Sequence, residues 1–599
     1  MSLVSAKEMA QASGLSRWGL LGELAGWVLI KITRISALNR FYDAHKHLDG
    51  PAFMQAVMDY FEIDVRWPEQ ELKRFPKTGP FVVVSNHPLG GIDGILLLLL
   101  VGSQRPDFKV MANFLLSRIT PLAPYIFPVN PFEDHKEASS SLQGFKQALA
   151  HLAEGGVLGI FPAGEVATTR AGNKSIDQPW HIPALKLIRK AGVPVVPVYF
   201  HAKNSTFFYR IARLGPAFRT AALVSEMFTQ RFRKISIRIG KPISVSQQEE
   251  ELTIEEYGAL LRLKTEMLSK VYERRRLTLP STIQLPKIPK KIVGAQDPEL
   301  LAREIAVLQQ LGKSLLKSKN YEVFLAQAPQ IPGLLQEIGR QRELTFRAIG
   351  EGTNKSIDLD TYDTYYHHLF LWDHEGACIV GAYRMGFGQE IFSAKGIEGF
   401  YVQDLFRMEP ELYPMMQRTI EMGRAYIVSE YQQKPMPLFL LWKGIIHTTL
   451  RYPDHDFLMG GVSISNQFSN FSKSLMIEFM KSHYWDPYIA QYIHPKKEFK
   501  VKLKDADKEF VFDETQADLN KFDRLIEEVE PGSLRLPVLI KKYIKQNAKV
   551  VAFNVDPLFN NAIDGLMYIK ISEIPEETVR PVMEEFQKEI ERGNHPINQ

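Results

Sequence analysis

Short apolar runs that end at proline or glycine predict a buried sheet in the first half of the chain. Phe81–Val84 is β-branched and lies between Pro80 and Ser85. Gly159–Phe161 ends in a Pro/Gly turn, and Val193–Val198 is entered through another tight turn. These runs have the length and composition of buried strands. The pattern therefore predicts an α/β fold.

A helical stripe of apolar residues lies between Leu15 and Ile35. Its members recur at steps of three and four, as one face of a helix requires. Glu23, Lys31 and Arg34 interrupt the run, so it falls short of the roughly 20 apolar residues of a transmembrane helix. We expect an amphipathic helix that either lies on a membrane surface or docks on the protein's own core. The stripe consists of Trp18, Leu21, Ala25, Val28, Ile32 and Ile35.

A proline-rich segment at residues 277–297 separates this half from a second one. Its prolines have the spacing of an extended, semi-rigid connection. Beyond it we expect a helix from about Glu299 to Ser318, another helix from Pro332, and a strand that ends at Arg384. The expected organisation is a helical region at 1–59, a domain at 60–276, the linker at 277–297 and a second domain at 298–585.

The composition excludes several classes of protein. A chain of 599 residues with 45% hydrophobic and 24% charged residues fits two or three folded domains. The single cysteine, Cys378, excludes a disulfide framework and a cysteine-based zinc site, and it fits a reducing cytosol. It stands in an apolar run that predicts a core position. The N-terminal residues lack the order of charge, apolar core and small residues that marks a secretory signal.

The charge balance is mildly basic, with a net charge of +5 and a pI near 8.8. Such a balance favours anionic partners without requiring them. The basic clusters are either solvated faces or surfaces for an anionic membrane or for acidic acyl carrier protein. They are Arg231–Lys234, Arg274–Arg276, Lys287–Lys291 and Lys541–Lys542.

The first candidate active-site residues, Asn86, His87 and Asp93, follow directly after the first strand. A histidine at the end of a strand lies at the lip of the sheet, where active sites form. A nearby carboxylate can hold the imidazole in one tautomer, so that the other nitrogen takes a proton from a hydroxyl. The alternative is a capped turn in which the histidine has no role. The apolar run Ile95–Val101 predicts a buried helix that begins near Asp93.

Three ordered motifs resemble those of the glycerolipid acyltransferases, the lysophosphatidate acyltransferase-like enzymes. Asn86-His87 with Asp93 is similar to the first motif, Phe161–Glu165 to the third, and the strand around Pro197 to the fourth. The resemblance covers roughly residues 60–275 and implies an O-acyltransferase sheet flanked by helices. It also implies that His87 and Asp93 are catalytic, and that substrate is bound by Asn86, Gly164, Glu165 and Pro197.

The departures from that family pattern concern the acceptor. Five residues instead of four separate His87 from Asp93, and glycines in Leu89–Gly91 allow the turn to bulge. The arginine and glutamate that contact phosphate in the family are missing. Because arginine is the natural partner of phosphate, their loss predicts an acceptor hydroxyl without a phosphate beside it. Glu165 either faces a cationic or amide-bearing acceptor or is a solvated turn carboxylate. The replaced positions lie near Asn130, Ala163 and Val166.

The second half holds an ordered set of charged and aromatic residues. Arg342 and Phe346 lie four apart, on one face of the helix from Pro332. The full set is Arg342, Phe346, Asp360, Asp363, Arg384, Glu421 and Arg424. It resembles the GNAT-superfamily amino-acid N-acyltransferases, which include the ornithine- and glycine-lipid synthases, and more distantly the autoinducer synthases. The match extends over roughly residues 320–570 and implies a GNAT-like mixed sheet.

This second resemblance implies that Glu421 and Arg424 are catalytic and that the other five residues bind substrate. Amide formation from an acyl thioester needs a neutral amine and a polarised carbonyl. Acidic residues can recognise an ammonium group, and arginine a carboxylate or a donor phosphate. The alternative is an ion-pair cluster that only fixes the fold. His367-His368 has no third ligand at suitable spacing, so no metal is expected.

The two resemblances together imply a bifunctional enzyme similar to ornithine lipid synthase. The C-terminal domain would N-acylate an amino acid, ornithine before glycine, with a 3-hydroxyacyl group, and the N-terminal domain would then O-acylate the hydroxyl. The alternatives are a phospholipid acyltransferase with a degenerate GNAT-like domain and a non-enzymatic haemolysin-like membrane protein.

The donor would be a thioester of acyl carrier protein or coenzyme A. No clear pyrophosphate-binding loop is visible, which favours acyl carrier protein, and no cofactor is expected to stay bound. The expected partners are acyl carrier protein, a membrane surface, the amino acid and the lyso-aminolipid, and no nucleic acid. The expected location is the cytoplasm, with peripheral association to the inner membrane.

Overall fold

The computed structural model divides the chain into two compact units. The first unit comprises Met1–Arg275 with Glu527–Leu534, and the second comprises Arg276–Ile526 with Arg535–Gln599. The expected linker at 277–297 is described only from residue 289, and Asn130 and the basic residues 231–233, 274–276 and 287–288 lie outside the described residues. The structure describes residues 7, 18–32, 34–129, 138–171, 174–212, 216–229, 234–248, 253–270, 289–503, 518–531 and 534–591.

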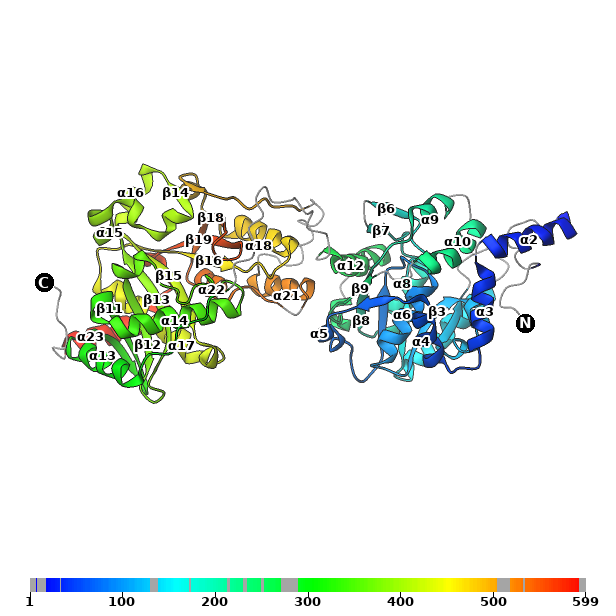
Figure 1. The fold of residues 1–599 in the computed structure, drawn as a ribbon, viewed down its shortest axis with the longest axis horizontal. Helices are drawn as coiled ribbons and strands as arrows, with labels where there is room; N and C mark the ends of the chain where they lie inside the picture. Colours follow the sequence, from blue (N-terminus) through cyan, green and yellow to red (C-terminus); the bar gives the residue numbers. More distant parts are fainter. Residues whose placement is uncertain are drawn as a thin grey trace. The chain divides into compact units, whose positions relative to one another are not determined.

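The first unit is built on a seven-stranded sheet (Figure 1). The five strands from β8 to β4 run parallel, and β9 is antiparallel to β8. The three apolar runs form β2, β5 and β8, which are almost fully buried, so these predicted strands are confirmed. In sheet order the strands are β1 (Asp64–Arg66), β9 (Lys234–Ile239), β8 (Val195–His201), β2 (Phe81–Ser85), β5 (Val157–Ile160), β3 (Phe108–Asn113) and β4 (Ile126–Val129).

Helices cover both faces of this sheet because side chains alternate along each buried strand. Phe81 and Val83 pack into one apolar core, with α3 (Ile35–His45), α4 (Gly50–Phe61) and α6 (Gly91–Gly102). Val82 and Val84 pack into the other, with α7 (Ala138–Ala153), α8 (Ile182–Ala191) and α12 (Ile254–Met267). The remaining elements of the unit are α5 (Glu69–Leu72), β6 (Thr169–Ala171), β7 (Lys174–Ile176), α9 (Thr206–Ile211), α10 (Pro216–Thr229) and α11 (Val245–Gln248).

The N-terminal helix expected between Leu15 and Ile35 is present over Leu20–Ile32, but its extension to Ile35 is wrong. The described residues form α2 (Leu20–Ile32) and α3, separated at Arg34, which has φ 61°. Ile35 lies in the core, whereas α2 buries Gly22, Gly26 and Ile30 and leaves apolar side chains exposed. None of the described helices is long and apolar enough to cross a membrane. The exposed fractions on α2 are 71% for Leu21, 60% for Leu24, 48% for Trp27 and 43% for Val28.

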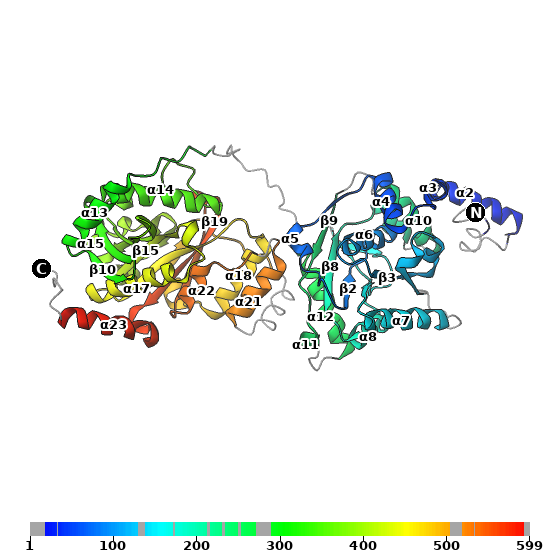
Figure 2. The same ribbon diagram turned by 90° about the horizontal axis from the view of Figure 1, so that it is seen from below.

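The second unit is built on an eight-stranded sheet (Figure 2). Its neighbouring strands are antiparallel, except for the parallel pair β15–β16. This mixed sheet is the GNAT-like arrangement that the sequence predicted. In sheet order the strands are β10 (Ser314–Ser318), β11 (Tyr321–Gln327), β12 (His367–Asp373), β13 (Cys378–Phe387), β15 (Thr419–Ile427), β16 (Phe457–Ile464), β19 (Ala562–Lys570) and β18 (Lys549–Asp556).

Helices again lie on both faces of the sheet. On one face α13 (Pro298–Gln310) and α14 (Pro332–Ala348) share a core with Phe324 and Phe370. On the other face, α17 (Pro435–Arg451) approaches so closely that a Cβ at Gly444 would lie 2.7 Å from Val323. The remaining elements are α15 (Gly388–Lys395), β14 (Phe406–Met408), α16 (Tyr413–Gln417), α18 (Asn470–His483), α19 (Pro487–Ala490), β17 (Ile493–Pro495), α21 (Leu519–Val529), α22 (Val538–Ile544) and α23 (Glu576–Glu591).

Two expectations for this unit need correction. The helix expected from Glu299 to Ser318 ends at Gln310, and residues 314–318 form β10 instead, paired with β11. Cys378 is half-buried at the start of β13, with its Sγ 3.7 Å from the Tyr431 hydroxyl, so it is not a full core residue.

The parallel strands β15 and β16 stop pairing about halfway along their length. They pair only from Thr419–Phe457 to Met422–Gly460, although β15 continues to Ile427 and β16 to Ile464. The register of β15 against β13 also shifts at this point, where Arg424 has φ 51°. The two strands therefore open a wedge in the sheet, with Arg424 at its start.

Candidate functional site

In the first unit, His87 and Asp93 meet at the carboxyl ends of parallel strands. His87 follows β2, and its Nδ1 lies 3.1 Å from Asp93 Oδ2. The His87 side chain is 16% exposed and that of Asp93 is fully buried. Burial raises the pKa of Asp93 above its ordinary value, against the stabilising hydrogen bond from His87. Because Nδ1 is held by Asp93, Nε2 is the nitrogen that an acceptor hydroxyl can reach.

The five-residue spacing is accommodated by the turn before α6, as the glycines predicted. Gly90 has φ +80°, a conformation that L side chains rarely adopt. The turn points the backbone N–H groups of Leu89 and Gly90 at Asp93 Oδ2, with distances of 2.7 and 3.0 Å. These donors and His87 fix the carboxylate in place.

Asn86 makes its hydrogen bonds to the neighbouring strand. Its side-chain amide donates to the Phe200 carbonyl at 3.0 Å and accepts from the Phe200 N–H at 2.7 Å. These two hydrogen bonds to β8 fix the end of β2, directly before His87. Its predicted contact with substrate stays a prediction.

The third motif forms the turn after β5, next to the histidine. The Phe161 ring stacks on the His87 ring, with centroids 4.3 Å apart. Gly164 has φ +65°, and Glu165 beside it is partly exposed. Pro197 lies inside β8, where its carbonyl accepts a hydrogen bond from Gly240 at 2.7 Å. The substrate-binding roles predicted for Gly164, Glu165 and Pro197 stay predictions.

A second carboxylate near His87 was not predicted from the sequence. Asp177 Oδ1 accepts a hydrogen bond of 3.1 Å from the backbone N–H of His87. Burial raises the pKa of Asp177 to about 6, against the opposing effects of His87 and Arg262. Asp177 follows a short polar hairpin with no apolar period, so no sequence signal marked it.

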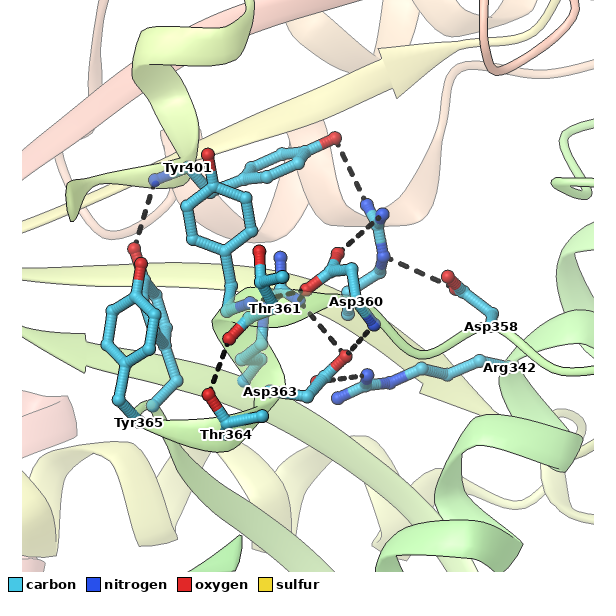
Figure 3. A network of polar contacts seen from close by, with 12 residues as sticks. Arg342, Asp358, Asp360, Thr361, Asp363, Thr364, Tyr365 and Tyr401 are labelled. Atoms are coloured by element: carbon cyan, nitrogen blue, oxygen red, sulfur yellow. Dashed lines mark hydrogen bonds and ion pairs between the residues drawn. The ribbon is translucent and has the colours of Figure 1, made fainter. Parts of the chain in front are cut away.

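In the second unit, the arginines and aspartates of the ordered set converge on one network (Figure 3). Arg384 Nη1 lies 2.6 Å from Asp360 and 3.3 Å from Asp363. Arg342 Nη1 donates to Asp363 Oδ1 at 2.7 Å. The buried Asp363 keeps its pKa well below its usual range, because the two arginines outweigh the effect of burial.

Arg424 joins this network from the start of the wedge. Its Nη1 donates to the Tyr401 hydroxyl at 3.2 Å (Figure 3). Its Nε lies 3.3 Å from Asp358, and its Nη2 lies 3.5 Å from Asp360. The sequence did not single out Asp358 or Tyr401. Neither stands at a position that pattern alone distinguishes from its neighbours.

Glu421 is buried and held by donors on both carboxylate oxygens. Oε2 accepts from the Tyr366 hydroxyl at 2.6 Å and from the Tyr401 N–H at 3.1 Å, and Oε1 accepts from the Val402 N–H at 2.9 Å. Burial raises the pKa of Glu421 to about 7 despite these donors. The residue thus anchors the segment that carries Tyr401. The predicted catalytic role of Glu421 stays a prediction.

The remaining residues that the sequence analysis named in this unit contact identifiable side chains or backbone groups. Phe346 packs into the α14 core and meets Tyr426, with ring centroids 6.5 Å apart. His368 Nε2 lies 3.0 Å from the Asp363 carbonyl, and burial lowers the pKa of this histidine to about 4. His367 pairs with Glu390 at 3.3 Å. Within the described residues, no group of three potential ligands could hold a metal ion.

Comparison with known proteins identifies both units. The family described as "Acyltransferase" matches residues 12–274, and the one described as "Acetyltransferase (GNAT) domain" matches residues 341–442. A protein of Phocaeicola vulgatus named lyso-glycine lipid O-acyltransferase is 32% identical over 213 residues, which are 34% of this chain and 74% of that protein. The chain belongs to the acyltransferase family. The non-enzymatic alternative is therefore wrong.

This acyltransferase is also similar to a second protein of the same organism, named glycine N(alpha)-acyltransferase. The two are 26% identical over 329 residues, 51% of this chain and 99% of that protein. A solved structure, the 1-acyl-sn-glycerophosphate acyltransferase of Thermotoga maritima, is similar at 18% identity and a TM-score of 0.26, over 41% of this chain and 97% of that one. The predicted α/β fold with an acyltransferase and a GNAT-like domain is confirmed, and so is acyltransferase activity as the enzyme class.

Proposed function

We propose that this acyltransferase makes a diacylated aminolipid in two steps. The second unit joins a 3-hydroxyacyl group to the amine of an amino acid, and the first unit esterifies the 3-hydroxyl with another acyl chain. One observation carries the proposal. A single chain is similar both to an N-acyltransferase named for glycine and to an O-acyltransferase named for a lyso-glycine lipid.

The site of the first unit supports the ester step. His87 Nε2 would take the proton of the acceptor hydroxyl while Asp93 holds Nδ1. The hydroxyl oxygen then attacks the thioester carbonyl, and the thiolate leaves. Ala163 and Val166, at positions where the phosphate-binding enzymes carry charged groups, are both buried apolar residues. This supports an acceptor without a phosphate.

The site of the second unit supports the amide step. Arg384 and Arg424 present guanidinium groups that suit a carboxylate, next to carboxylates that suit an ammonium group. An amino acid carries both groups. Arg384 Nη2 is buried without a hydrogen-bond partner among the described residues, which leaves a donor for a ligand.

Glycine is our first candidate for the amino acid, since both relatives are named for glycine. Ornithine, which the sequence resemblance favoured, is the second. The proposed donor is a thioester of acyl carrier protein, with coenzyme A as the other candidate.

We further propose that the acyltransferase associates peripherally with the cytoplasmic face of a membrane. Its proposed product is a lipid, and α2 exposes Leu21, Leu24, Trp27 and Val28. Lys31 lies over the Trp27 ring at 3.9 Å, so a basic group borders these apolar side chains. This combination suits the interface of an anionic bilayer.

Expression of the full chain in a bacterium that lacks aminolipids tests the proposal. Mass spectrometry of the lipid extract should show a diacylated amino acid, and its mass identifies the head group. The same chain should fail to rescue a strain that lacks lysophosphatidate acylation. Robust rescue without any amide-linked lipid would instead establish a phospholipid acyltransferase.

A further inference from the structure

Asp564 is a partly exposed carboxylate on β19, close to the wedge between β15 and β16. It lies opposite Ser463 on β16 and Asn554 on β18. No described side chain or backbone group donates a hydrogen bond to its carboxylate or forms an ion pair with it. This distinguishes Asp564 from the aspartates that contact Arg342, Arg384 and Arg424.

The space beside Asp564 is open although it lies over the middle of the sheet. Gly461 on β16, the first residue beyond the pairing with β15, is exposed. A Cβ at Gly461 would meet only Asp564, whose Cβ and Oδ1 would each lie 3.9 Å away. A small ligand above Gly461 would therefore touch the Asp564 carboxylate.

The charges around Asp564 come from several elements. Asp556 at the end of β18 and Glu351 after α14 are negative neighbours, and Arg424 on β15 is a positive one. Glu351 is fixed by the Ser463 hydroxyl at 2.7 Å, and Asp556 by the Leu558 N–H at 2.7 Å. Burial and the two negative neighbours raise the pKa of Asp564 to about 8, against the opposing effect of Arg424.

The other carboxylates of the site are already engaged. Asp360 and Asp363 are paired with arginines, and both oxygens of Glu421 accept hydrogen bonds. A carboxylate held by an arginine is a poor proton acceptor, because the pair stabilises its ionised form.

We propose that Asp564 is the general base of the amide step, a role that rests on the proposed N-acylation of an amino acid. Asp564 takes one proton from the ammonium group of the amino acid. The neutral nitrogen attacks the thioester carbonyl, so that a C–N bond forms and the C–S bond breaks. The departing thiolate takes the second proton from the nitrogen, and Asp564 releases the first to water.

The test uses the purified full chain with glycine or ornithine and 3-hydroxypalmitoyl-acyl carrier protein as donor. For the wild type, kcat/KM for the amino acid should rise with pH through a midpoint near 8, because the free enzyme must lose the Asp564 proton. Asp564→Asn should lower kcat/KM by about a hundredfold or more and remove this rise.

The variant Asp556→Asn distinguishes a chemical role of Asp564 from a purely structural one. Asp556 raises the pKa of Asp564, so its neutralisation should move the midpoint to lower pH while the product stays the same. Asp454→Asn, an exposed carboxylate in the loop before β16, is the matched control and should leave the profile unchanged.

The outcomes are distinct. A folded Asp564→Asn protein with near-normal kcat/KM and an unchanged pH profile would overturn the role of Asp564 alone. A midpoint unmoved by Asp556→Asn would also contradict it. A wild-type chain that N-acylates no amino acid would overturn the proposed function, and the role of Asp564 with it.

Discussion

At the scale of single residues, the first site depends on how a glycine turn presents Asp93 to His87. The contact between His87 and Asp93 was predictable because both residues follow a buried strand within one short turn and match an ordered acyltransferase motif. Asp177 and Asp564 were not predictable. Their positions depend on a hairpin and on cross-strand register, which bring together residues far apart in the chain.

Gly90→Ala should weaken both the turn and the ester step. A side chain at φ 80° and ψ −128° costs about 1–3 kcal/mol, and the new Cβ would lie 3.2 Å from both Val166 and Leu223. We expect a lower thermal transition for the first unit and less diacylated product. Gly91→Ala is the control, since its Cβ would meet no atom within 4 Å. Equal behaviour of the two variants would contradict the strained turn.

Arg424→Lys should impair the amide step while the unit stays folded. One ammonium group cannot replace the contacts of a guanidinium with Tyr401, Asp358 and Asp360. We expect at least a tenfold loss of N-acylation in assays with purified protein. In cells mono- and diacylated lipid should fall together, because the amide product supplies the hydroxyl. Arg418→Lys, which alters an exposed pair with Asp456, is the control. Normal lipid levels in the Arg424 variant would remove Arg424 from the site.

At the scale of elements, the buried strands were predictable from short β-branched apolar runs that end at proline or glycine, and α6 from the longer leucine-rich run Ile95–Val101. The end of α13 was not predictable from the sequence. Residues 314–318 carry a helix-compatible pattern, yet they pair with β11 after a turn at Gly312, which has φ +66°. The wedge between β15 and β16 was also beyond prediction, because pairing between strands separated by α17 leaves no local signal.

We predict that the exposed apolar face of α2 contacts the membrane. Leu21→Glu with Leu24→Glu should reduce partition to anionic vesicles at least tenfold, because two apolar side chains lose their contact with the bilayer. Both residues are exposed in the fold, so the first unit should remain stable. Val538→Glu, at an exposed apolar position of the second unit, is the control. Unchanged partition of the double variant would exclude α2 as the membrane contact.

At the scale of the whole molecule, the chain joins two acyltransferase domains whose sites carry different chemistry. One has a histidine–aspartate pair, to which we assign the hydroxyl acceptor, and the other has an arginine–aspartate network, to which we assign the amino acid. In the proposed function, the order of the two steps follows from the substrates, since the hydroxyl to be esterified arrives with the first acyl chain.

The decisive measurement for the division of labour between the two units is the ratio of mono- to diacylated aminolipid in cells that express His87→Ala. Loss of a general base typically lowers a rate by about a hundred- to ten-thousandfold. We predict that monoacylated amino acid accumulates and that the diacylated lipid disappears. An unchanged ratio in a folded His87→Ala protein would contradict the account.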